Sequence, residues 1–289
     1  MNNIGIIYNA RIPEALELAT TILKKLALPE DSWLSPAENL ETLRERAANT
    51  GLVVTVGGDG TILRAAQVTA PSAIPVVGIN MGRLGFMTEL RVHEALEKLP
   101  QYFNGAHRVE ERNMLQATVV KGGEGSVSQM EGPFHALNDA VMARGAVSRL
   151  VTIAVHIDAA ELTTFRADAV ILSTATGSTG YNLAVGGPIL DPASEALVLK
   201  PVAAHLGLSA GLVLASSVKV TLSLEGHQQA ILSVDGFVEY PLEAGDRVEL
   251  KQSPYKARFL RAHPPSQFYG TLRRRLGLGV SGQEGTPAR

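Results

Sequence analysis

The first hundred residues alternate between short apolar runs typical of buried strands and longer amphipathic stretches typical of helices. Residues 4–8 are a β-favouring run, and residues 52–56 and 74–79 are almost continuously apolar, as in strands buried on both faces of a sheet. After Pro13, apolar residues recur every three or four positions, which predicts an amphipathic helix. The recurring residues are Leu16, Ala19, Leu23 and Leu26. This alternation predicts a parallel sheet covered by helices.

The pattern changes after about residue 100. Short segments rich in Val, Ile, Leu and Thr follow one another, and Gly or Asp often stands between them. The segments are residues 115–120, 151–157, 169–173, 218–224, 230–234 and 247–250. Closely spaced turns with few long helical stretches predict an antiparallel, β-rich second domain. We therefore expect an α/β domain over residues 1–104 and a β-rich domain over 105–264, with residues 265–289 packing back on the first.

Composition narrows the class of protein. The 289 residues carry 26 Lys and Arg against 28 Asp and Glu, a net charge of −2, which argues against a nucleic-acid-binding protein. Without Cys there is no disulfide framework, thiol nucleophile or Cys-ligated metal. The sequence shows neither a signal peptide nor about 18 consecutive apolar residues, so we expect a cytoplasmic protein without a membrane span. The scattered histidines lack metal-ligand spacing, and we predict no zinc site.

A glycine-rich loop, Gly57-Gly58-Asp59-Gly60-Thr61, directly follows the predicted strand 52–56 and precedes a helical pattern. Glycines let a phosphate approach the backbone N–H groups, and a helix N-terminus favours an anion. Asp59 adds a carboxylate that could orient a hydroxyl or hold Mg²⁺. The same residues also fit a tight turn with Asp59 or Thr61 as N-cap. The place at the carboxyl end of a buried parallel strand favours a ligand site.

Two further segments carry weaker signals. Residues 80–86 (Asn-Met-Gly-Arg-Leu-Gly-Phe) form a second glycine loop, again straight after a strand, so the two loops suggest one shared crevice. Asn138-Asp139 is by its residue types most often a turn or cap. Its alternative role is to bind a nucleoside, with the carboxylate accepting hydrogen bonds from ribose hydroxyls and the amide contacting a neighbouring ring.

The segment 166–188 is the richest in potential chemistry. A β run there ends in Thr176-Gly-Ser-Thr-Gly180, which combines hydroxyl groups with a flexible backbone, and Tyr181 follows with a stacking face. Ser, Thr and Gly also dominate ordinary loops, but so many hydroxyls beside one aromatic ring favour a nucleoside-phosphate site. By contrast, the run Arg273 to Arg275 indicates a solvated helix face more than a nucleic-acid patch.

Together these motifs resemble the NAD kinase family over nearly the whole chain. The resemblance is carried by residues 57–61, 80–86, 137–139, 176–181 and 186–190. The first motif is shared with lipid kinases and 6-phosphofructokinases, whereas the 137–139 and 176–181 motifs in this order and spacing are highly specific. The resemblance implies an α/β N-terminal domain plus a β-rich C-terminal domain of the NAD kinase/diacylglycerol kinase-like class, with the site between them.

The resemblance also implies roles for individual residues. Asp59 matches the family's proposed general base on the 2′-hydroxyl of the adenosine ribose. Phosphate contacts fall on Gly57, Gly58, Gly60 and Thr61, and Arg64 could approach phosphate from the first turn of its helix. Contacts to NAD fall on Asn138, Asp139, Arg149, Arg166, Asp168, Thr176, Thr179, Gly180, Tyr181 and Ala184. Gly180 and Ala184 stand where the family usually has Ala and Ser, so a hydroxyl contact is lost at Ala184.

The implied activity is transfer of the terminal phosphate of ATP to NAD⁺, giving NADP⁺ and ADP. ATP would come with Mg²⁺ or another divalent cation, no side chain is assigned as a metal ligand, and the implied assembly is a homodimer or tetramer. Two other hypotheses stay open at this point: a lipid or sugar kinase of the same superfamily, and a dinucleotide-binding regulator without catalysis. A carboxylate is a weak base for an alcohol, so we expect Asp59 to accept the proton late in the transition state.

Overall fold

The computed structural model describes residues 3–82, 85–122, 129–146, 149–205 and 208–277. The described chain divides into two compact units. The first, here called the α/β unit, takes in residues up to 65, residues 76–109 and residues from 260 onward. The second, the β-rich unit, takes in residues 66–75 and 110–259. The tail expected to pack back on the first domain is described only as far as residue 277.

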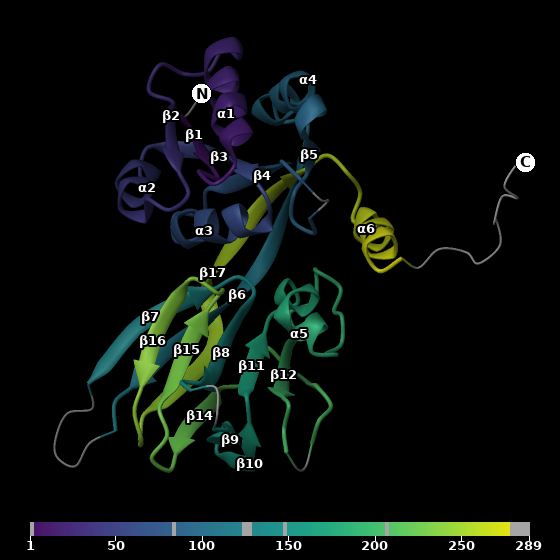
Figure 1. Cartoon of the computed structure of the whole chain (residues 1–289). Coiled ribbons are helices and arrows are strands. Elements are labelled where there is room, and N and C mark those ends of the chain that lie inside the picture. The colour runs from purple at the N-terminus through teal and green to yellow at the C-terminus, as the bar shows by residue number, and fades with distance from the viewer. Residues whose placement is uncertain (1–2, 83–84, 123–128, 147–148, 206–207, 278–289) are drawn as a thin grey trace, which may run out of the picture. The chain divides into compact units, whose positions relative to one another are not determined.

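The α/β unit is built on a parallel sheet with the strand order β4-β3-β1-β2, and β5 pairs in parallel with β4 (Figure 1). Its strands are β1 (Asn3–Tyr8), β2 (Trp33–Pro36), β3 (Thr50–Gly57), β4 (Pro75–Asn80) and β5 (Leu90–Arg91). β3 is buried along nearly its whole length. Continuous burial explains why this strand is apolar without alternation.

Helices cover both faces of this sheet, as Figure 1 shows, with α1 and α4 on one face and α2 and α3 on the other. Their bounds are α1 (Pro13–Lys25), α2 (Leu40–Ala47), α3 (Asp59–Thr69), α4 (Val92–Phe103) and, after the last strand, α6 (Gln267–Arg275). α1 and α4 share one hydrophobic cluster with β1, β3 and β4. The buried stripe of α1 is Ala15, Ala19 and Ile22, whereas Leu16, which we expected inside, is 42% exposed.

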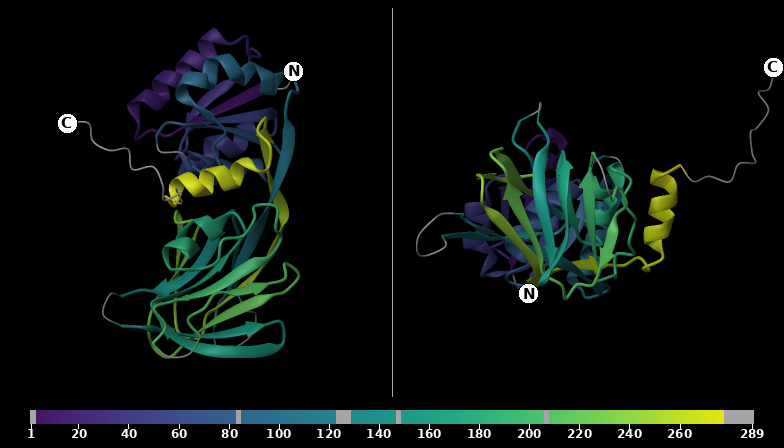
Figure 2. Two further views of the ribbon diagram at one scale, coloured as in Figure 1. Left: turned by 90° about the vertical axis from the view of Figure 1, so that its right-hand side faces the viewer. Right: turned by 90° about the horizontal axis from the view of Figure 1, so that it is seen from below.

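The β-rich unit contains two sets of paired strands, seen from two further sides in Figure 2. One sheet has the order β13-β12-β11-β8-β15-β16 and is antiparallel throughout. In the other set, β10-β9-β14-β17 are consecutive and β6 pairs with β17 and β7. The bounds are β6 (Arg108–Val120), β7 (Met130–Ala136), β8 (Asp139–Arg144), β9 (Val151–Ile157), β10 (Ala160–Ala167), β11 (Ala169–Ser173), β12 (Leu197–Val202), β13 (Leu212–Leu214), β14 (Val220–Glu225), β15 (Ala230–Val234), β16 (Val238–Leu242) and β17 (Arg247–Arg261).

Side chains from both sheets bury one another in a single core. Phe165 of β10 and Leu222 of β14 belong to the same buried cluster as Val170 of β11 and Leu232 of β15. The cluster holds the two sheets face to face, as in a sandwich. The predicted fold class, an α/β unit with a parallel sheet and an antiparallel β-rich unit, is confirmed. Among the described residues no helix is long and apolar enough to cross a membrane.

We predict that Phe165→Ala destabilises the protein by about 3–5 kcal/mol, because it removes a large, fully buried side chain and leaves a cavity. Leu162→Ala on the same strand is the matched control, since Leu162 is 37% exposed. Guanidinium unfolding followed by circular dichroism gives both values. Equal losses in the two variants would contradict the placement of Phe165 in the core.

Candidate active site

The glycine loop places the carboxylate of Asp59 at the junction of β3 and α3. β3 ends at Gly57 and α3 begins at Asp59. The side chain turns toward a neighbouring loop, where Oδ2 accepts a hydrogen bond from the backbone N–H of Phe86 at 2.9 Å and Oδ1 accepts one from Met87 at 3.1 Å. A Cβ at Gly85 would collide with this carboxylate, so the loop can approach only because residue 85 has no side chain. The carboxylate is fixed in orientation yet 27% exposed.

The backbone beside Asp59 is open to a ligand. Among the described residues, apart from the adjoining backbone, no atom lies within 4 Å of the position that a Cβ would take at Gly58 or Gly60. The first turn of α3 is closed by the N–H of Thr61, which donates to the carbonyl oxygen of Gly58 at 3.0 Å. Arg64 lies half-buried on the same helix. An accessible glycine backbone at a helix N-terminus suits a phosphate group, as the sequence predicted.

Arg275 adds a positive charge that the sequence analysis did not assign to this site. Its Nη1 lies 3.9 Å from Oδ2 of Asp59, and its Cζ lies 4.5 Å from the centre of the Phe86 ring. Phe86 also contacts Phe268 of α6, with ring centroids 6.0 Å apart. Residues 273–275 are all exposed, as expected for a solvated helix face, but Arg275 also contacts Phe86 and lies near Asp59. The contact of the guanidinium with Phe86 holds a cation beside the Asp59 carboxylate.

A second cluster lies in the β-rich unit, around the turn that leads into β8. The buried carboxylate of Asp235 accepts three backbone hydrogen bonds there: from Leu137 at 2.8 Å, from Asn138 at 2.7 Å and from Asp139 at 3.1 Å. Gln67 donates to the same carboxylate at 3.4 Å. The expected Asn138-Asp139 turn is therefore present, and a carboxylate that follows β15 organises it.

The segment after β11 is tied to the same turn. The hydroxyl of Thr174 donates to the carbonyl oxygen of Leu137 at 2.6 Å and accepts from the N–H of Gly177 at 3.1 Å. The N–H of Thr174 donates to the carbonyl oxygen of Asn138 at 2.9 Å. A Cβ at Gly177 would collide with that same carbonyl, and a backbone atom cannot move aside as a side chain can. The two most specific motifs of the family resemblance, residues 137–139 and 176–181, thus belong to one hydrogen-bonded cluster.

The hydroxyl groups of this segment serve the loop itself rather than facing outward. The segment folds as a 3₁₀ turn, η1 (Gly177–Thr179), followed by the short helix α5 (Tyr181–Ala184). The Ser178 hydroxyl donates to Ala175 and accepts from Leu190, and that of Thr179 donates to Thr176. The hydroxyls of Ser178 and Thr179 therefore hold the loop in shape, and the nucleoside-phosphate site expected at this loop stays a prediction.

Three groups remain available to a ligand. The Oδ1 atom of Asn138 is buried and has no hydrogen-bond partner among the described groups. Gly180 brings its backbone close to the Asn138 amide, and the ring of Tyr181 is 44% exposed. A buried amide oxygen without a donor is costly, and a bound ligand would satisfy it. Ala184 lies exposed at the end of α5.

Arg112 is a second residue that sequence reasoning missed. It lies on β6, is 5% exposed, and pairs with Glu110 at 2.6 Å. Its Nη1 lies 3.4 Å from the hydroxyl oxygen of Thr176. Thr176, which we expected to contact the dinucleotide, is itself 7% exposed. A buried guanidinium behind the loop has no local sequence signal, because β6 alternates polar and apolar residues like any half-buried strand.

Asp139 and Asp235 form a pair of buried carboxyl groups. Burial, with the nearby Asp235 carboxylate, raises the pKa of Asp139 to about 7. Burial also raises the pKa of Asp235, but its hydrogen-bond donors work in the opposite direction. We conclude that Asp235 is the ionised member, because three N–H groups point at it, and that Asp139 keeps a proton at mildly acidic pH.

The structure places Asp168 at the end of β11 that lies away from this cluster. Asp168 precedes β11, and the antiparallel register pairs Ala169 with Ala143 at one end of the strands and Ser173 with Asp139 at the other. Five residues of extended chain separate Asp168 from Ser173, a span of about 16 Å. Asp168 instead pairs with Arg144 at 3.0 Å, and Arg149 and Arg166 are exposed.

We predict that the contribution of Asp139 to the free energy of unfolding falls as pH rises from about 4 to about 7, so that Asp139→Asn loses less stability than wild type across this window. An unfolded Asp loses its proton near pH 4. In the folded protein Asp139 keeps its proton up to about pH 7. Between about pH 4 and pH 7 the folded state therefore binds a proton at this residue that the unfolded state has lost, and the stability contributed by this proton decreases as pH rises. The slope of this decrease is at most about 1.4 kcal/mol per pH unit. Urea unfolding across the window measures it, and exposed Glu161→Gln is the control. Identical slopes in wild type and Asp139→Asn would contradict the raised pKa.

Two family models match most of this chain. Residues 23–107 match the ATP-NAD kinase N-terminal domain, and residues 137–262 match the ATP-NAD kinase C-terminal domain. Among solved structures, yeast NADH kinase complexed with NADH has a TM-score of 0.82 and covers 99% of this chain and 90% of its own, at 23% identity. An NAD kinase from Archaeoglobus fulgidus in complex with ATP has a TM-score of 0.73 and covers 94% of this chain and 98% of its own, also at 23% identity. These two structures show the same fold.

Closer relatives exist in sequence. The NAD kinase of Chloroflexus aggregans is 43% identical over 229 residues, which are 79% of this chain and 81% of that protein. The NAD kinase of Dehalococcoides mccartyi strain BAV1 is 40% identical over 274 residues, which are 94% of this chain and 95% of that protein. With such identity along nearly its whole length, this chain belongs to the NAD kinase family.

Proposed function

We propose that this protein transfers the terminal phosphoryl group of ATP to the 2′-hydroxyl of the adenosine ribose of NAD⁺, forming NADP⁺ and ADP. The observation that carries the proposal is the Asp59 carboxylate, oriented by the N–H groups of Phe86 and Met87 beside an open glycine backbone. Support for NAD⁺ as acceptor comes from relatives named NAD kinase at 40% and 43% identity.

Asp59 acts as the general base. The lone pairs not used by the two backbone donors accept the hydrogen bond of the ribose 2′-hydroxyl. The hydroxyl oxygen forms a bond to the γ-phosphorus while the bond from that phosphorus to the bridging β–γ oxygen breaks, and ADP leaves. The hydroxyl proton passes to Asp59 late in this step, because a carboxylate is a weak base for an alcohol.

Charge neutralisation comes from several groups. The N–H groups at the start of α3 and the Arg275 guanidinium face developing negative charge on the transferred phosphoryl group. No group of three or more His, Asp or Glu in the described part of the chain could hold a metal ion on its own. Mg²⁺ keeps several waters and binds substrate phosphates, so it would enter with ATP and would not need the carboxylate that serves as the base. When bound, Mg²⁺ would supply further positive charge to the phosphates.

The cluster around Asn138 binds the dinucleotide. The unpartnered Asn138 amide oxygen accepts a hydrogen bond from the ligand, and the exposed Tyr181 ring provides a stacking surface. Asp139, held by the turn, faces a ribose hydroxyl.

The proposal also includes assembly as a homodimer or tetramer, which light scattering tests. It includes a cytoplasmic location as well, which cell fractionation tests.

Asp59→Asn should fold and lose about 10²–10⁴-fold in kcat, because the amide cannot take the proton and can accept only one of the two N–H bonds from the 86–87 loop. Production of NADP⁺ from NAD⁺, ATP and Mg²⁺, read with an NADP-specific dehydrogenase, measures the loss. Exposed Asp31→Asn, in the same unit, is the control and should retain full activity. Near-normal turnover of Asp59→Asn would refute the assignment of the base.

Arg275→Met should lower kcat about 10–100-fold at saturating ATP, because it removes a cation that stabilises the transition state more than the bound substrate. Methionine keeps the unbranched aliphatic part of the side chain but removes the guanidinium, and with it the contact of Cζ with the Phe86 ring. Arg273→Met, two residues earlier on the same exposed helix end, should have little effect. Equal rates in the two variants would show that Arg275 has no part in the reaction.

A further inference from the structure

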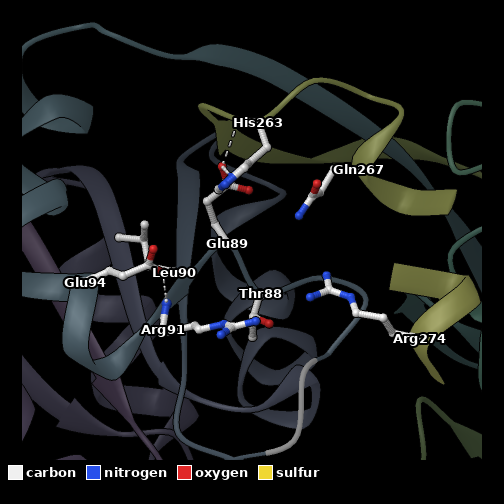
Figure 3. Close-up of a pocket in the computed structure, with 8 residues that line it drawn as sticks. All are labelled: Thr88, Glu89, Leu90, Arg91, Glu94, His263, Gln267 and Arg274. Carbon is white, nitrogen blue, oxygen red and sulfur yellow. Dashed lines mark hydrogen bonds and ion pairs between the residues drawn. The ribbon is translucent and has the colours of Figure 1, made fainter. Parts of the chain in front are cut away.

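A pocket of about 140 Å³ lies in the α/β unit, apart from the glycine loop. Figure 3 shows that it is formed by three segments: the chain around β5, the first turn of α4, and the stretch from His263 into α6. The side chains that matter here are Glu89, Arg91, Glu94, His263, Gln267 and Arg274.

The two carboxylates of the pocket are already satisfied. Glu89 is paired with Arg261 at 3.3 Å and accepts hydrogen bonds from Nδ1 of His263 at 2.8 Å and from the Tyr102 hydroxyl at 3.1 Å. Although burial acts to raise it, these partners hold the pKa of Glu89 below its ordinary value. Glu94 is paired with Lys98 at 2.5 Å, which lowers its pKa. Each negative charge therefore has a cation of its own.

The two arginines have no such partner. No carboxylate among the described residues lies within ion-pair distance of Arg91 or Arg274, and Arg274 makes only a 3.4 Å contact with the carbonyl oxygen of Gly270. In Figure 3 both guanidinium groups point toward the middle of the pocket. Like charges that share a pocket repel each other, so the arrangement is relieved by an anion placed between them.

Neutral donors complete the lining. The Gln267 amide points into the same space in Figure 3, and the bond from Nδ1 of His263 to Glu89 leaves the ring's Nε2 without a partner among the described residues. Arginine forks match the oxygens of phosphate and carboxylate in pairs. The donors thus come from both sides of the pocket and are aimed at one place.

We propose that this pocket binds a small oxyanion, a free phosphate or a small carboxylate, held by Arg91 and Arg274. The volume decides the size class, because pockets for drug-sized ligands measure roughly 300–1,000 Å³ and this one has less than half of that lower value. The glycine loop of residues 57–61 does not line it. The proposal therefore stands independently of the proposed kinase activity.

The test is calorimetric titration of the full chain with inorganic phosphate, and separately with malonate, at constant ionic strength set by chloride. We expect wild type to bind at least one of the two, and Arg91→Ala/Arg274→Ala to bind it at least about tenfold more weakly per arginine removed. Arg273→Ala is the matched control, because it removes the same charge from the same helix outside the pocket. Thermal unfolding without ligand verifies that each variant folds, and Arg274→Gln replaces the double variant if that one does not.

Each outcome decides the matter. Binding of phosphate alone or of malonate alone, lost in the double variant and kept in Arg273→Ala, supports the site and names the oxyanion class. No binding of either anion overturns the proposal. Equal weakening in Arg273→Ala also overturns it, since the effect would then be general surface charge. Displacement of the anion by saturating ATP would show that it occupies the donor site and would equally refute a separate pocket.

Discussion

A carboxylate partly or fully withdrawn from water needs hydrogen-bond donors, and at Asp59 and Asp235 backbone N–H groups supply them. Asp59 draws the 86–87 loop toward the end of β3, and Asp235 draws the turn before β8 toward the end of β15. Both approaches need a residue without a side chain, Gly85 in one unit and Gly177 in the other. In each cluster a carboxylate, Asp59 or Asp235, accepts hydrogen bonds from the backbone of a neighbouring loop and so fixes its position. The geometry of the candidate ligand site depends on these bonds.

Local signals were enough to predict the parallel sheet and the glycine loop. The apolar run of β3 and the glycines after it are contiguous in sequence. The hydrophobic pattern therefore predicted the strand, and the glycines predicted the turn that follows it. Partners far apart in the chain were not predictable in this way. Asp235 and Asn138 are 97 positions apart, and no spacing rule connects them. The same holds for Arg275 and Asp59, which meet from the two ends of the chain.

Two sequence signals were less informative: the hydroxyl-rich composition of the segment after β11 and the amphipathic pattern of α1. The hydroxyl-rich segment after β11 was expected to face a ligand, yet Ser178 and Thr179 use their hydroxyls to replace backbone hydrogen bonds inside a tight, irregular loop. In α1, two sets of apolar residues fit the helical repeat, one containing Ala15 and the other containing Leu16. Ala15 and Ala19 are buried, whereas Leu16 is exposed. Close packing against strands favours the set with the small residues, which hydrophobicity alone does not reveal.

Helix α6 places two neighbouring arginines in different surroundings, Arg274 at the pocket of Figure 3 and Arg275 beside Asp59 and Phe86. Successive residues of a helix are turned by about 100° from one another, so this division depends on the number of residues before them. Inserting or deleting a single residue earlier in α6 would rotate both guanidinium groups away from their neighbours at once. The nine-residue helix can therefore accept many substitutions, but an insertion or a deletion within it would disturb both arginine positions.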